Sequence, residues 1–87
     1  MASRGFEDLE AWQYSRTVIT ETYRATGRFP SSEQFNLTSQ MRRASVSIGS
    51  NIAEGSSRGS RKDFARFLSM ALGSAAELKS QAINAKD

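Results

Sequence analysis

The polar residues with the most regular spacing in the chain are Gln40, Arg43, Ser47, Asn51 and Glu54. On a regular helix each residue advances by about 100 degrees, so these five side chains fall within an arc of roughly 80 degrees. A guanidinium, an amide and a carboxylate on one helix face are groups that could hold a polar substrate or move a proton. We call this candidate site the polar seam.

A second polar band later in the chain would extend the polar seam; it consists of Asp63, Ser74, Glu77 and Gln81. If the two helices pack antiparallel the bands meet, and Arg43 would then pair with Glu77. A catalytic interpretation needs Glu54 or Glu77 as general base, but no second placed acid and no metal completes the set. The favoured interpretation is a hydrogen-bonded network that fixes helix register, and we expect no catalytic residues and no enzyme.

Basic residues are concentrated in the second part of the chain. Residues 1–34 carry four Arg against five acids, whereas residues 35–87 carry eight bases against four acids. One stretch contains six of these bases, namely Arg42, Arg43, Arg58, Arg61, Lys62 and Arg66. Such a cluster attracts phosphates and predicts RNA or DNA binding, although a merely solvated helix surface stays open as the alternative. The Gly- and Ser-rich segment 55–62 does not have the spacing of a phosphate-binding loop and follows a helix instead of a strand.

The 87 residues include neither Cys nor His. The usual ligands of zinc, haem and iron-sulfur clusters are therefore missing, as are the thiol nucleophile and the commonest neutral-pH base. We expect no metal site, no cofactor and no small-molecule substrate. The chain has no apolar run near the roughly 20 residues that cross a bilayer, so we expect a cytoplasmic protein without a membrane partner.

Hydrophobic periodicity predicts a single helical domain over residues 1–87. The first helix is expected at about 8–26, where Leu9, Trp12, Ile19 and Tyr23 form its apolar stripe before Gly27. The second is expected at about 33–55, with Gly55 as its end and Gly49 as a bend or a close helix contact. The aromatic side chains lie in these apolar stripes and are expected in the core, not as platforms for nucleic-acid bases.

A third helix is expected at about 61–85. Ser60 is placed to cap it, and Asp63 faces the positive end of the helix dipole. The apolar face that follows is wide, and includes Phe64, Phe67, Leu68, Ala71, Leu72, Ala75 and Leu78. No alternating pattern typical of a strand is present.

Four segments together resemble one known family. They are residues 6–13 (FEDLEAWQ), 37–44 (LTSQMRRA), 47–55 (SIGSNIAEG) and 67–74 (FLSMALGS). On these motifs the chain is identified as a member of the bacterial four-helix bundle proteins, also called 23S ribosomal RNA intervening-sequence proteins. The resemblance covers nearly the whole chain.

The resemblance implies an all-α, antiparallel, up-and-down four-helix bundle that assembles as a homo-oligomer, a pentamer in relatives, with no established enzymatic activity. A related accessory protein of retroelements binds nucleic acid through a basic surface, which supports the six basic residues as candidates. Relatives continue into a fourth helix, which we expect to be absent from this sequence, so only the first three helices are expected here. We expect the Leu68/Leu72/Leu78 face to stay partly uncovered, leaving the chain marginally stable or associated. A purely protein-interaction or structural module without a nucleic-acid role remains the alternative function.

Overall fold

The structure of the protein is a computed structural model, of which residues 5–86 are described. This part of the chain is all-helical and has no strand. Its three main helices are α1 (Glu10–Thr26), α2 (Ser39–Ser57) and α3 (Arg61–Lys86). Three shorter helical turns complete it: the 3₁₀ turns η1 (Gly5–Asp8) and η2 (Ser31–Glu33), and the π-helical segment η3 (Gln34–Thr38).

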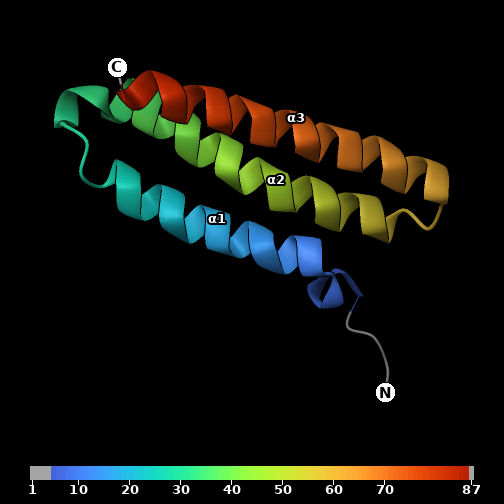
Figure 1. The fold of residues 1–87 in the computed structure, drawn as a ribbon. Helices are drawn as coiled ribbons and strands as arrows, with labels where there is room; N and C mark the ends of the chain where they lie inside the picture. Colours follow the sequence, from blue (N-terminus) through green and yellow to red (C-terminus); the bar gives the residue numbers. More distant parts are fainter. Residues whose placement is uncertain (1–4, 87) are drawn as a thin grey trace.

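The helices run antiparallel in chain order, with α2 between α1 and α3 (Figure 1). Both outer helices pack along α2, and the contacts between α2 and α3 are the more extensive. The buried apolar core is small and lies mainly where α2 meets α3; it comprises Met41, Ala44, Ile52, Phe67 and Ala71. Because α2 is the shared partner, it positions residues on both sides of the molecule.

The face that helix α1 turns to α2 coincides only in part with its predicted apolar stripe. Its buried residues are Ser15, Thr22 and Thr26, whereas Tyr23 is 43% exposed. The prediction of a core position for Tyr23 is therefore wrong. Small side chains occupy the centre of the α1–α2 interface because they allow the two helix backbones to approach closely. The Tyr23 ring lies at the edge of this interface.

Helix α2 begins and ends later than expected. The chain becomes helical after Pro30, but passes through the 3₁₀ turn η2 and the π-helical η3 before the α-helical hydrogen bonds begin at Ser39. Gly55 does not end α2, which runs on to Ser57. A Cβ atom added at Gly55 would lie 2.6 Å from Cβ of Phe67, so this glycine is required for close packing on α3.

The start of α3 follows the predicted capping. The backbone N–H of Asp63 donates to Oγ of Ser60 at 3.1 Å, which satisfies one of the free donors of the first turn. Gly59 precedes the cap with a φ of +82°, a conformation that favours glycine. Helix α3 extends to Lys86 against an expected 85, and α1 begins at Glu10 against an expected 8 because the chain around residue 8 is a 3₁₀ turn.

Several large apolar side chains lie on the surface. Leu72 is 72% exposed and Ile83 is 53% exposed, both on α3, while Leu68 and Leu78 are half-buried. Tyr14 on α1 is 70% exposed. The expectation of a partly uncovered face on α3 is thus met at Leu72. None of the helices in the described part of the chain is long and apolar enough to cross a membrane.

Candidate functional site

The six candidate basic residues form two separate clusters. Arg58, Arg61, Lys62 and Arg66 surround the turn between α2 and α3, and we call them the turn cluster. Arg42 and Arg43 lie near the start of α2, and we call them the groove pair. At a rise of about 1.5 Å per residue, Arg42 and Arg58 are about 24 Å apart along α2. One continuous basic patch, as the sequence stretch suggests, is therefore not formed.

Two arginines of the turn cluster are engaged with neighbouring side chains. The guanidinium groups of Arg58 and Arg66 lie over the ring of Phe67, with their central carbons 5.0 and 4.6 Å from its centroid. Arg58 also pairs with Glu54 at 3.6 Å, and Arg66 with Asp63 at 3.7 Å. These arginines cover a buried aromatic residue, so part of their role is packing.

The other two members of the turn cluster are free. Arg61 and Lys62 are exposed, and neither forms an ion pair or a side-chain hydrogen bond within the described residues. They belong to the first turn of α3, where the helix dipole adds to their positive charge. The turn cluster thus has four bases and two acidic partners, and its two unpaired cations point to solvent.

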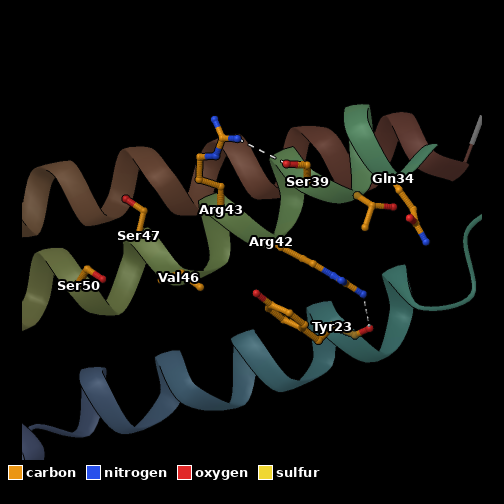
Figure 2. Close-up of a pocket in the computed structure, with 9 residues that line it drawn as sticks. Tyr23, Gln34, Ser39, Arg42, Arg43, Val46, Ser47 and Ser50 are labelled. Atoms are coloured by element: carbon orange, nitrogen blue, oxygen red, sulfur yellow. Dashed lines mark hydrogen bonds between the residues drawn. The ribbon is translucent and has the colours of Figure 1, made fainter. Parts of the chain in front are cut away.

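The groove pair is held in a different way. Nε of Arg42 donates to Oγ1 of Thr26 at 2.9 Å, and its guanidinium carbon lies 4.4 Å from the ring centroid of Tyr23. Figure 2 shows Arg42 reaching from α2 to Tyr23 on α1, while Arg43 projects from α2 in another direction and donates to Oγ of Ser39 at 3.5 Å. Arg42 is fixed between two helices, and Arg43 is exposed.

An open hollow of about 830 Å³ lies beside the groove pair. The residues that line it come from α1, η3 and α2, and are Tyr23, Gln34, Thr38, Ser39, Arg42, Arg43, Val46, Ser47 and Ser50. None of these lining residues is acidic. Thr38 is buried, and its hydroxyl oxygen has no hydrogen-bond partner in the part of the chain that is described.

Three residues of the polar seam are joined by hydrogen bonds. The hydroxyl groups of Ser47 on α2 and Ser74 on α3 are 2.9 Å apart. Nδ2 of Asn51 donates to Oγ of Ser47 at 3.1 Å and to the Ser47 carbonyl oxygen at 2.9 Å. These groups form one half-buried polar link between two helices.

The remaining members of the polar seam do not join this link. Glu54 pairs with Arg58, and Glu77 accepts a hydrogen bond from Nε2 of Gln81 at 3.2 Å. Arg43 bonds to Ser39, so the structure does not form the expected Arg43–Glu77 pair. The reason is that each charged group has a nearer partner on its own helix. Gln40 is exposed.

The acidic side chains considered as general bases for the polar seam are Glu54 and Glu77. No group of three or more His, Cys, Asp or Glu side chains in that range is placed to hold a metal ion. The carboxylates nearest the seam are engaged by Arg58 and Gln81. What the geometry offers instead is cationic surface and hydrogen-bonding groups.

The profile of the 23S rRNA-intervening sequence proteins matches residues 7–87. The chain belongs to this family. The match spans the turn cluster, the groove pair and the polar seam, so all three lie in the family domain. A comparison of the chain with curated proteins finds no match. The family description names no bound ligand and no reaction.

Sequence reasoning missed two residues of this surface, Tyr23 and Thr38. Tyr23 has the spacing of a core residue, and its neighbour Arg42 is distant in sequence, so no local pattern links them. Only the α1–α2 packing brings the ring and the guanidinium together. Thr38 lies in a π-helical segment, and no sequence signal predicted that its hydroxyl would be buried without a partner.

Proposed function

We propose that this family member is a non-enzymatic helical-bundle protein that binds RNA or DNA through the turn cluster. The observation that carries the proposal is the pair of free cations, Arg61 and Lys62, at the exposed start of α3. Unpaired cations release counterions from a nucleic acid without first giving up a protein partner, so they contribute most to phosphate binding. Such a function belongs in the cytoplasm, and a sequence without cysteine is compatible with that compartment.

The other members of the turn cluster support this role less directly. Arg58 and Arg66 cover Phe67 and lie beside Glu54 and Asp63, so their charges are partly neutralised. They hold the turn in shape and keep its field positive. Affinity at this site is therefore expected to depend mainly on Arg61 and Lys62.

Assembly is the second part of the proposal. Leu72 and Ile83 expose apolar surface on α3. Apolar surface of this kind favours association, so we propose that the three helices form part of an antiparallel four-helix bundle and that the protein is a homo-oligomer. Sedimentation analysis tests this: the wild type should associate, and Leu72→Ser should weaken the association. A wild-type protein that sediments as a monomer would refute it.

The nucleic-acid function is tested by fluorescence anisotropy with labelled RNA and DNA across a salt series. The logarithm of the binding constant should fall linearly with the logarithm of salt concentration. The double variant Arg61→Gln/Lys62→Gln should reduce the magnitude of that slope by about 1.4 to 1.8, corresponding to two lost phosphate contacts. The matched control is Lys79→Gln/Lys86→Gln, which removes the same charge from the other end of α3 and should leave the slope near that of the wild type.

The same titration separates the alternative function. Equal losses in both double variants would show that net charge alone drives binding, and the turn cluster would have no special role. Absence of binding at low salt would refute the nucleic-acid function. The exposed apolar residues would then favour a protein-interaction module.

A further inference from the structure

We infer that the hollow beside Arg42 and Arg43 binds one nucleotide of a single-stranded nucleic acid, with its base against the Arg42–Tyr23 pair and its phosphate at Arg43. The inference rests on the proposed function, because it assumes that the protein binds nucleic acid. It adds a second contact surface, about 24 Å along α2 from the turn cluster at a rise of about 1.5 Å per residue.

The charge of the hollow favours an anion. Two arginines and no acidic side chain are among the residues that line it. Arg43 is exposed, and its only hydrogen bond within the described residues is the 3.5 Å bond to Ser39, so most of its donors are free. The hydroxyl groups of Ser39 and Ser50 add donors that suit phosphate or ribose oxygens.

The stacked pair supplies a flat surface for a base. Arg42 is held over Tyr23 by its bond to Thr26, and a second contact joins its Nη2 atom to the Tyr23 carbonyl oxygen at 3.5 Å (Figure 2). The guanidinium is therefore fixed in orientation before any ligand arrives. Tyr23 is still 43% exposed. Aromatic rings and arginine planes are the usual stacking partners of unpaired bases.

This geometry selects single strands over duplexes. In a duplex the base faces are stacked on one another, so a protein surface can reach the backbone and the base edges but not a base face. The turn cluster would contact either form through phosphates. The hollow beside Arg42 and Arg43 adds affinity only when a base is unpaired and unstacked. The wild-type protein should therefore bind a single strand more tightly than the duplex of the same sequence.

The test compares a labelled single-stranded RNA with its duplex, by anisotropy, using the full chain. Tyr23→Leu removes the ring and should weaken single-strand binding by roughly 5- to 100-fold while changing duplex binding little. Tyr14→Leu is the matched control, because Tyr14 is an exposed tyrosine of the same helix that does not line the hollow. It should bind both forms as the wild type does.

A second pair of variants tests the phosphate contact. Arg43→Gln should reduce the single-strand salt slope by about 0.7, whereas Arg24→Gln, which breaks an exposed pair with Glu21, should not. Because Tyr23→Leu also removes the support under Arg42, a measurement on the wild type is needed as well. Photo-crosslinking with 5-bromouracil-substituted RNA should yield an adduct at Tyr23.

The outcomes distinguish this inference from the proposed function. Equal binding of single strand and duplex by the wild type, or equal losses in Tyr23→Leu and Tyr14→Leu, would overturn the groove site and leave the turn cluster intact. An adduct that maps away from Tyr23 and its neighbours would also overturn it. Loss of all binding in Arg61→Gln/Lys62→Gln, with the strand preference of Tyr23→Leu unchanged from wild type, would support the turn cluster alone.

Discussion

The two interfaces of α2 are built in different ways. Toward α1, the packing uses small residues: α1 buries Ser15, Thr22 and Thr26, and Ser15 lies against Gly49 of α2. Toward α3, Gly55 lies against the base of the Phe67 side chain, and Ser47 bonds to Ser74 across the interface. The α1 side of α2 is packed with small residues. The α3 side combines a large residue packed on glycine with a polar link between the helices.

The hydroxyl groups of the α1 side are satisfied within their own helices. Oγ of Ser15 donates to the Trp12 carbonyl oxygen at 2.6 Å, and Oγ1 of Thr26 donates to that of Thr22 at 2.7 Å. Such bonds to the preceding turn satisfy the hydroxyl hydrogen of a buried polar side chain, and Oγ1 of Thr26 also accepts the bond from Nε of Arg42 on α2. The α1 interface is therefore close, and its polar contacts across the helices come from Arg42 of α2. The α3 interface is the more extensive of the two and has the Ser47–Ser74 bond as its polar contact. We expect the α2–α3 interface to be the more stable of the two and the more sensitive to substitution.

The largest effect is expected at Gly55. In Gly55→Ala the new Cβ would lie 2.6 Å from Cβ of Phe67, the fixed base of that side chain, so the helix backbones must move apart. Overpacking of this kind costs about 1 to 3 kcal/mol. Urea unfolding, followed by circular dichroism at one protein concentration, measures the loss. A variant as stable as the wild type would show that the α2–α3 contact is looser than the structure indicates.

The polar link gives the next effect. Ser47→Ala and Ser74→Ala should each destabilise the protein by about 1 kcal/mol, and the double variant should cost less than the sum because both remove the same hydrogen bond. A double-mutant cycle on the unfolding free energies measures the coupling. Strict additivity would mean that the 2.9 Å contact contributes nothing to the α2–α3 interface. The structural role of the seam would then have to rest on Asn51.

Sequence alone predicted the helical content and the start of α3, because those depend on local signals. Hydrophobic periodicity and the Ser60 cap are properties of a few neighbouring residues. The faces turned toward α2 were harder to predict. The apolar stripe of α1 suggested Tyr23 as core, but the interface is closed by Ser15 and Gly49, whose fit depends on distance between two backbones and not on hydrophobicity.

The candidate site, too, was predictable where it depends on local spacing and was not predictable where it depends on partners. The polar seam was predicted from helical spacing, and spacing does bring Ser47 and Asn51 to one face. The partners of its charged members were not predictable, since Arg58 follows Glu54 by one helical turn and competes with any residue on α3. The six basic residues are close together in the sequence, but a helix separates the ends of this stretch in space. Arg42 lies near the start of α2, and Arg58 lies directly after its end.

A smaller effect of opposite sign is expected at Gly73, which lies inside α3 away from both interfaces. A Cβ added there would meet nothing within 4 Å, and the residue is exposed. Gly73→Ala should therefore stabilise the protein by about 0.5 to 1 kcal/mol through helix propensity alone. Thermal unfolding measures the gain. A loss at this position would indicate that the exposed side of α3 is covered in solution, which would favour the proposed assembly.

The smallest net change is expected at Gly49, the centre of the α1 interface. In Gly49→Ala the new Cβ would lie 2.5 Å from Oγ of Ser15, an atom that can rotate away only by giving up its bond to Trp12. That loss, about 1 kcal/mol, is of the same size as the helix-propensity gain, so the two should nearly cancel. In a Ser15→Ala background the obstructing oxygen is gone, and Gly49→Ala should then stabilise by about 0.5 kcal/mol. If Gly49→Ala were as damaging as Gly55→Ala in both backgrounds, the Cβ of Ser15, at 3.3 Å, would be the obstacle, and the α1 side of α2 would be as rigid as the α3 side.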